Sequence, residues 1–150
     1  MRTASAHAEV VLAPAPALAL WTDVSRWPSF VEGFARLLQS DSAWPAPEAR
    51  VIWESVSAGR GRVTEKVVES SGDRITTLVF EDRLAGRQTF RVAPGQTGAA
   101  VELSLEYTLT KYGPLGSVAD ALFIRRAIRD SLRRTLFRFT VEAEEEAGQR

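Results

Sequence analysis

The feature that most constrains this chain is its last third, from Pro114 to about Ala147, which predicts one long helix. At about 100° per residue, several apolar residues fall on one side of that helix, namely Val118, Leu122, Leu132, Leu136 and Ala143. A helix of this length spans on the order of 45 Å, because each residue adds about 1.5 Å. It is long enough to cross a whole β-sheet diagonally, so we expect the upstream residues to form a sheet that this helix covers.

The upstream residues contain short strand-like runs separated by turn residues. Two short helical segments are also expected, Ala15–Thr22 after Pro14 and Arg26–Val31 after Ser25, which can cap it. The expected strands are residues 6–12, 34–39, 50–57, 62–69, 74–81, 87–92 and 100–110. In the last of these, apolar residues alternate with polar ones, which indicates a sheet with one buried face and one solvated face.

The order of these elements predicts an α+β fold. Consecutive strands joined by short loops usually pair as antiparallel neighbours, and a sheet with one apolar face needs a layer to cover it. We therefore expect a seven-stranded, curved antiparallel sheet wrapped around the long C-terminal helix, in the order strand, two short helices, six strands, long helix. The length of 150 residues is that of one domain, with no linker or repeat, so residues 1–150 are taken as a single unit.

Composition excludes several classes of function. The chain has no cysteine and a single histidine, His7, so thiolate chemistry and histidine-rich metal sites are excluded and no metal or other cofactor is expected. Positive and negative side chains balance at 19 each, and the basic residues are spread out, which argues against a nucleic-acid partner. No run approaches the roughly 20 apolar residues of a membrane span, and no signal peptide is evident, so a cytoplasmic location is expected.

Three stretches resemble the START/Bet v1-like superfamily, in particular the SRPBCC group that includes polyketide cyclases/dehydrases and lipid-transport proteins. They are AEVVLAPAPALALWTDVSRWPSFVEGF, GRGRVTEKVVES and EYTLTKYGPLGSVADALFIRR. The resemblance implies a helix-grip (Bet v1-like) fold with a deep cavity between the sheet and the C-terminal helix. It also implies a hydrophobic ligand such as a lipid, sterol, quinone or polyketide. Some relatives cyclise or dehydrate poly-β-ketone chains, many only bind, and a few act through protein partners.

Aromatic side chains on elements that would surround a central volume are the first candidates for contacts with such a ligand. An apolar pocket is lined in this way, although the same residues could simply pack a core. Tyr107 is distinctive because a buried phenol needs a hydrogen-bond partner, which could be protein, water or ligand. The aromatic candidates are Trp27, Phe30, Phe34, Trp53, Phe80, Phe90 and Tyr107.

Two arginines of the long helix, Arg125 and Arg129, fall within the same stripe as Leu122 and Leu132. An unpaired guanidinium on a core face would be costly. The sequence leaves three solutions open: pairing with a carboxylate such as Glu106 or Asp82 or a bend in the helix, projection at a cavity mouth, or contact with a polar or anionic ligand group. Leu122, Arg125 and Arg129 therefore complete the set of candidate ligand-binding residues.

The catalytic residues stay unknown at this stage, because no nucleophile elbow, paired histidines or phosphate-binding loop is present. Gly59-Arg60-Gly61 predicts only a hairpin turn. The leading hypothesis is binding of an apolar small molecule by a monomer or homodimer. The alternatives are an aromatase/cyclase-type enzyme that would use Tyr107 with an arginine, and an interaction module that would dock an acidic partner on the face from Arg125 to Arg138.

Overall fold

A computed structural model describes residues 2–57, 59–110 and 118–149, apart from the side chains of residues 118–120. The predicted turn at Gly113-Pro114 and the predicted helix start at Leu115–Ser117 lie outside these residues. The strands are β1 (Arg2–Val10), β2 (Phe34–Ser40), β3 (Arg50–Ser55), β4 (Arg62–Ser70), β5 (Arg74–Phe80), β6 (Leu84–Pro94) and β7 (Ala99–Leu109). The helices are α1 (Pro14–Thr22), the 3-10 turn η1 (Val24–Arg26), α2 (Trp27–Phe30) and α3 (Val118–Gly148).

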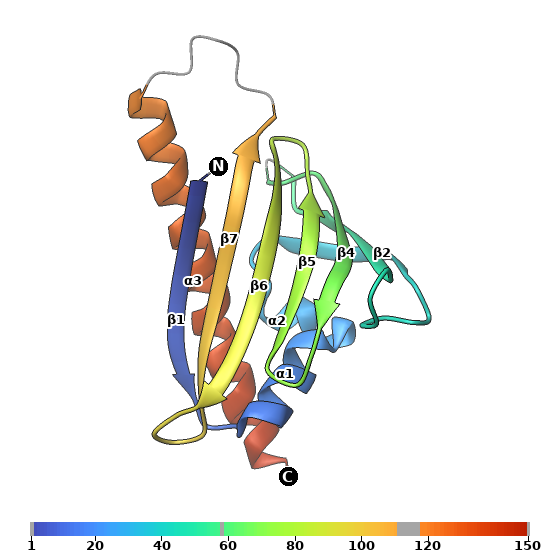
Figure 1. Cartoon of the computed structure of the whole chain (residues 1–150), viewed down its shortest axis with the longest axis vertical. Helices are drawn as coiled ribbons and strands as arrows, with labels where there is room; N and C mark the ends of the chain where they lie inside the picture. Colours follow the sequence, from blue (N-terminus) through green and yellow to red (C-terminus); the bar gives the residue numbers. More distant parts are fainter. Residues whose placement is uncertain (1, 58, 111–117, 150) are drawn as a thin grey trace.

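The seven strands form one antiparallel sheet in the order β1-β7-β6-β5-β4-β3-β2 (Figure 1). The predicted helix-grip fold is thereby confirmed. The first strand begins four residues earlier than predicted, because β1 pairs with β7 along its whole length, from Arg2 opposite Tyr107 to Val10 opposite Ala99. The residues before Ala6 show no alternation that would predict a strand. The start of β1 is therefore determined by its pairing with β7, which is a tertiary contact.

Helix α3 lies along β1 and β7 on one side of the sheet. Helices α1 and α2 lie near the carboxyl end of α3 (Figure 1). The apolar phase of β7 faces this layer, as the alternation predicted, and Val101, Leu103, Leu105 and Tyr107 are buried. None of the described helices has a stretch long and apolar enough to cross a bilayer.

An aromatic cluster joins the short helices to the sheet and to the second half of α3. Trp21 of α1 stacks on Phe90 of β6 with ring centroids 4.3 Å apart. Phe139 of α3 meets Trp21, Phe30 and Phe90 edge-on at 5.7, 5.1 and 5.3 Å. Edge-to-face and offset-stacked pairs of this kind add to the stabilisation from buried area, so the cluster fixes this end of α3 to the fold.

Charged pairs reinforce the same end of the helix. Arg26 bonds Glu142 through Nε at 3.0 Å and Glu146 through Nη1 at 2.8 Å, and its side chain is only 27% exposed. Arg134 pairs with Glu32, whose backbone N–H donates to the hydroxyl of Thr135. These contacts connect residues more than 100 positions apart, which is why no local pattern in the sequence indicated them.

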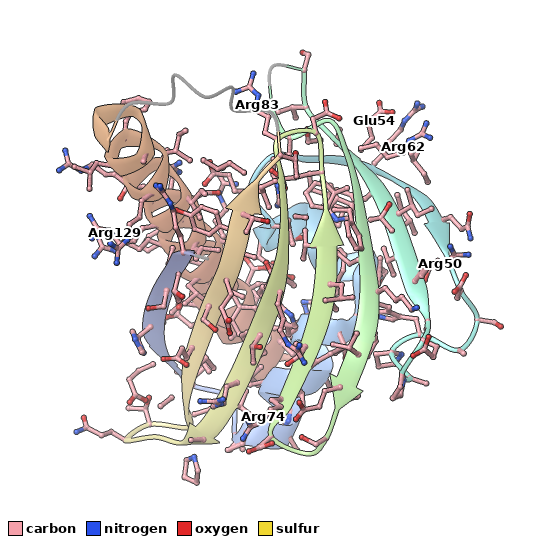
Figure 2. All side chains as sticks on the ribbon, turned by 45° about the horizontal axis from the view of Figure 1, so that its top comes forward. Arg50, Glu54, Arg62, Arg74, Arg83 and Arg129 are labelled. Carbon is pink, nitrogen blue, oxygen red and sulfur yellow. The ribbon has the colours of Figure 1, made fainter. Side chains whose placement is uncertain are left out.

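Two expectations about burial were wrong. Phe80 is 49% exposed, because its neighbour Val79 takes the inward phase of β5 and leaves Phe80 on the outer face of the sheet. Arg125 and Arg129 are both exposed, and Figure 2 shows Arg129 projecting from α3 away from the sheet. Arg125 lines a surface groove with Arg2 at the start of β1, which is an edge strand, so this part of the stripe faces water.

Candidate functional site

A chamber of about 330 Å³ lies between the sheet and the first half of α3. Its sheet wall comes from β6 and β7, through Leu84, Leu105 and Leu109, and its helix wall includes Ile124 and Ile128. Turn residues border the chamber at the end where β5 meets β6, and one of them, Arg83, lies at that end of the sheet (Figure 2). The volume falls within the range of pockets that take small organic ligands.

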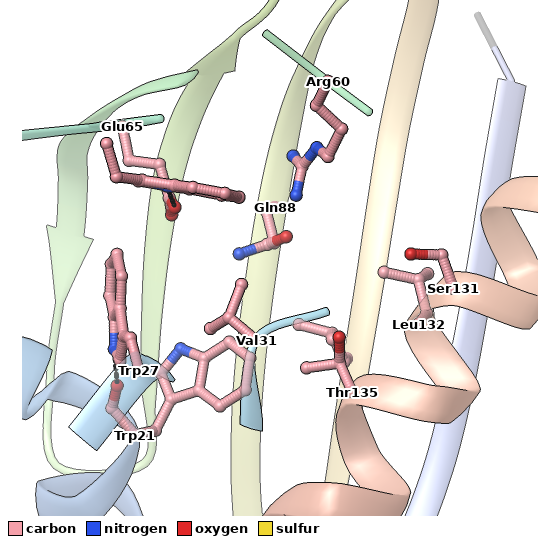
Figure 3. A pocket seen from close by; sticks show the side chains of 11 residues that line it. Trp21, Trp27, Val31, Arg60, Glu65, Gln88, Ser131, Leu132 and Thr135 are labelled. Carbon is pink, nitrogen blue, oxygen red and sulfur yellow. Dashed lines mark hydrogen bonds between the residues drawn. The ribbon is translucent and has the colours of Figure 1, made fainter. Parts of the chain in front are cut away.

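A smaller recess of about 30 Å³ continues the chamber towards the core. Arg60, Gln88, Ser131 and Leu132 line both spaces, so the two are adjoining parts of one site. The recess itself is closed by aromatic side chains, Trp21, Trp27 and Trp53, and by the carboxyl group of Glu65 (Figure 3). The site thus has an apolar body and a polar inner end.

Glu65 is the unusual residue of the inner end. It lies on β4 between Val63 and Val67, in the inward phase of the strand, and is 6% exposed. Its Oε2 accepts a hydrogen bond from Trp53 Nε1 at 2.9 Å, and its Oε1 accepts one from the Thr77 hydroxyl at 3.3 Å. Burial raises the pKa of the Glu65 carboxyl above its ordinary value, although both bonds and the positive charge of Arg60 act in the opposite direction.

Arg60 enters the site from the turn between β3 and β4. Its Nε donates to Glu81 at 2.5 Å, and its guanidinium carbon lies 5.0 Å from the centre of the Trp53 ring. The pairing with Glu81 offsets its charge, and the ring supports it from one side. In Figure 3 the end of the guanidinium points towards Gln88, whose amide group projects between the sheet and α3.

The sequence-predicted residues divide into three groups in the structure. Trp27 and Trp53 line the recess. Phe30 and Phe90 are buried in the aromatic cluster, and Phe34 stacks on Trp53 at 5.1 Å. The remaining apolar candidates lie elsewhere: Phe80 is on the outer face of the sheet, and Leu122, which is 61% exposed, lines a surface groove with Arg125 and Arg2.

Tyr107 is buried on the inward face of β7, and its hydroxyl has no hydrogen-bond partner among the residues that the structure describes. It is not among the residues that border the chamber or the recess. The two arginines that were expected to accompany it, Arg125 and Arg129, do not border them either. Because both arginines are exposed, neither places a charge in the core. The arginines of α3 from Arg125 to Arg138 are all exposed.

Glu65, Arg60 and Gln88 were missed by the sequence analysis. A signal for Glu65 was available, since it is a carboxylate that alternates with Val63 and Val67 in the apolar phase of the strand. Gln88 similarly shares its phase with Phe90 and Val92 of β6. Arg60 carried no such signal, because a residue in a hairpin turn has no periodic neighbours.

The arrangement can hold an apolar molecule and exchange hydrogen bonds with one end of it. A buried carboxyl group beside a guanidinium can also transfer a proton to or from a bound molecule. Among the described residues no cluster of three or more histidine or carboxylate side chains is placed to hold a metal ion.

Comparison with known proteins extends these observations. Residues 1–144 match the family described as "Polyketide cyclase / dehydrase and lipid transport". No curated protein sequence gives a significant match.

Three solved structures illustrate the likeness in fold. The protein TTHA0849 from Thermus thermophilus is 17% identical, with a TM-score of 0.79 over 97% of this chain and 99% of that one. The di-domain ARO/CYC StfQ from the steffimycin biosynthetic pathway is 18% identical, with a TM-score of 0.77 over 97% of this chain and 51% of that one. A START superfamily protein from Mycobacterium smegmatis is 12% identical, with a TM-score of 0.75 over 95% of this chain and 97% of that one.

At such identities these structures establish a shared fold, while the family match rests on the sequence itself and covers nearly all of it. The helix-grip architecture and that match together show that this chain belongs to the polyketide cyclase/dehydrase and lipid-transport family.

Proposed function

We propose that this protein binds an apolar small molecule in the chamber between the sheet and the first half of α3. The observation that carries the proposal is the chamber itself, about 330 Å³ in volume and walled by leucine and isoleucine side chains. A concave space of this size with apolar walls can enclose much of a small organic molecule, and it gives such a molecule apolar surface on which to leave water. The family, described by cyclisation, dehydration and lipid transport, supports an apolar ligand.

Native mass spectrometry of freshly purified protein tests this proposal directly. We expect a species heavier than the polypeptide by the mass of a small organic molecule, which is lost on extraction with organic solvent. As a second measurement, the thermal unfolding midpoint should rise with at least one member of a panel of fatty acids, sterols, quinones and aromatic polyketides, because binding to the folded state alone stabilises it. A bare polypeptide mass together with an unmoved midpoint across the panel would argue against a binding function.

A second candidate function is catalysis of the cyclase or dehydratase type. The observation that favours it is the buried Glu65 carboxyl beside Arg60 at the inner end of the site, since aldol chemistry needs a proton-transfer group next to a polarised carbonyl in a dry pocket. This pair replaces Tyr107 and an α3 arginine as the candidate machinery, because those side chains do not border the site.

The measurement for this candidate is turnover of a poly-β-ketone surrogate by wild type, Glu65→Gln and Tyr107→Phe. A catalytic role of Glu65 predicts that Glu65→Gln reduces turnover by roughly 100-fold or more, while Tyr107→Phe stays close to wild type. Turnover that is absent in wild type, or unchanged in Glu65→Gln, would leave ligand binding as the function.

A further inference from the structure

The polar recess at the inner end of the chamber has a size and a chemistry of its own. Its volume of about 30 Å³ is room for about one water-sized group. The chamber, at about 330 Å³, is about ten times larger than the recess, at about 30 Å³. A ligand whose body fills the chamber can therefore extend only one small substituent into the recess.

The recess offers hydrogen-bond donors that no described protein group uses. Arg60 bonds Glu81 through Nε, and no bond from its two terminal nitrogens is present among the described residues. The amide of Gln88 likewise has no hydrogen-bond partner in the described part of the chain, although it is half-buried and points into this space (Figure 3). Its amide atoms remain accessible from the recess, so a group that displaces water there has to make hydrogen bonds with them in place of that water.

The same recess also offers acceptors. The Glu65 carboxyl is buried, lines the recess and takes part in no ion pair among the described residues, since Arg60 pairs with Glu81 instead. Each of its oxygens accepts one hydrogen bond from the protein, from Trp53 and from Thr77, and a carboxylate oxygen has lone pairs for a second. The Gln88 carbonyl oxygen is a further acceptor.

We infer that the recess is a binding site for a hydroxyl group, and that the protein's ligand is an apolar molecule carrying an alcoholic or phenolic hydroxyl at one end. This inference rests on the proposed function, because the body of the ligand occupies the chamber. A hydroxyl is the smallest group that both donates and accepts, so it can accept from Arg60 or Gln88 and donate to Glu65 at the same time.

Other end groups leave part of this constellation unsatisfied. A methyl group would bury the amide of Gln88 without a partner. A carbonyl oxygen would accept from the donors but offer no hydrogen to the Gln88 carbonyl oxygen. A carboxylate would bring a second acid next to the buried Glu65, where Arg60, the one cation among the described residues that line the recess, is already paired with Glu81.

Matched ligands with one common body test the inference. Binding of 4-butylphenol, 4-butylbenzyl alcohol, 4-butyltoluene and 4-butylbenzoate is measured by isothermal titration calorimetry on the full chain. We expect at least one of the two hydroxyl compounds to bind about tenfold or more tighter than 4-butyltoluene, because a site built around a hydroxyl loses affinity for the analogue that lacks it. Which of the two binds tighter distinguishes a phenol from an alcohol.

The variant Gln88→Leu keeps the volume of the side chain and removes its hydrogen-bonding groups. It should reduce the tenfold preference to about threefold or less, because the hydroxyl compounds lose a partner and 4-butyltoluene no longer buries an unpaired amide. Gln96→Leu, a substitution of the same kind in the exposed turn between β6 and β7, is the control and should retain the preference. Thermal unfolding of both variants checks that each is folded.

The outcomes separate this inference from the proposed function. Equal affinity for 4-butylphenol, 4-butylbenzyl alcohol and 4-butyltoluene overturns the hydroxyl site and leaves an apolar binding protein. Tighter binding of 4-butylbenzoate than of either hydroxyl compound also overturns it, in favour of an acid-binding recess. A hydroxyl preference that survives in Gln88→Leu contradicts the assignment, and failure of all four compounds to bind counts against both proposals.

Discussion

The two halves of α3 belong to the same helix but face different surroundings. In the second half, Leu132, Leu136, Phe139 and Ala143 are buried against the sheet and the short helices. In the first half, Phe123 is 74% exposed, and Ile124 and Ile128 line the chamber, with Ile128 also touching the margin of the packed core. The second half thus anchors the helix, whereas the first half forms one wall of a binding space.

An amphipathic pattern therefore indicates which face of a helix is apolar, but it does not indicate what that face packs against. The stripe runs through both halves, and it meets aromatic rings in one and open volume or water in the other. We therefore expect substitutions in the second half to change stability and those in the first half to change ligand binding.

The largest effect is expected at Phe139, whose ring is fully buried in the aromatic cluster. Phe139→Ala should lower the free energy of unfolding by about 3–5 kcal/mol, because it leaves a cavity among rings that cannot close in. Phe137→Ala, at a position that is 72% exposed, is the matched control and should stay within about 0.5 kcal/mol of wild type. Urea unfolding measures both, and similar losses for the pair would remove the distinction between anchor and surface.

The Arg26 contact comes next. Arg26→Ala removes the bonds to Glu142 and Glu146 and should cost about 1–2 kcal/mol, since charge-assisted bonds in a partly buried place exceed those on the surface. Arg134→Ala breaks the pair with Glu32, but this arginine side chain is 55% exposed, so the loss should be below about 1 kcal/mol. Denaturant titration measures the free energy of unfolding of both variants. A larger loss for Arg134→Ala would mean that the pair with Glu32, rather than Arg26, is the stronger attachment of α3.

A substitution in the first half of α3 should affect binding instead. Ile128→Trp places an indole in the chamber and should weaken binding of 4-butyltoluene by about tenfold or more, which corresponds to about 1.4 kcal/mol. The unfolding free energy should change by less than about 1 kcal/mol, because the added volume enters existing space. Leu122→Trp, at an exposed position, is the control for adding an indole. Undiminished binding by Ile128→Trp would mean that the ligand lies outside the chamber.

The polar recess differs from the rest of the core because its contribution to stability depends on pH. Because the pKa of Glu65 is raised on folding, its contribution to stability is complete below the pKa of an unfolded glutamate and declines as pH rises through the folded pKa. Glu65→Gln cannot ionise, so it should gain stability relative to wild type as pH increases from about 4 to 8, glutamate in unfolded chains titrating near pH 4.3. Thermal unfolding over this range tests the trend. A difference that is constant with pH would show that Glu65 ionises as easily in the folded protein as in the unfolded chain.

The fold could be predicted almost completely from the sequence because its signals are local and periodic. The alternation of Val101, Leu103 and Leu105 gives the inward face of β7, and the spacing of Leu132 and Leu136 gives the buried face of α3. Short turns then leave antiparallel pairing as the natural arrangement of the strands. Where periodicity was weak, as around Phe80, the predicted burial was wrong.

The candidate site could be predicted only in part. Trp27 and Trp53 were identified as aromatic residues on elements that enclose the centre of the fold, and they do line the recess. Arg125 and Arg129 were identified from their angular position on α3, but nothing in a helical pattern reveals that the opposite surface is the edge of a sheet. Arg60 reaches the site from a hairpin turn, and turns have no period from which a direction can be read.

What the sequence by itself determined is the set of elements, their order and which face of most of them is apolar, since these follow from the period of two in strands and of 3.6 in helices. The tertiary structure alone decided where that apolar surface is packed and where it encloses a space. The bonds of Glu65 to Trp53 and Thr77, and the pairing of Arg60 with Glu81, each join residues 12 to 21 positions apart. The polar end of the site exists because the pairing of β3, β4 and β5 brings these side chains together.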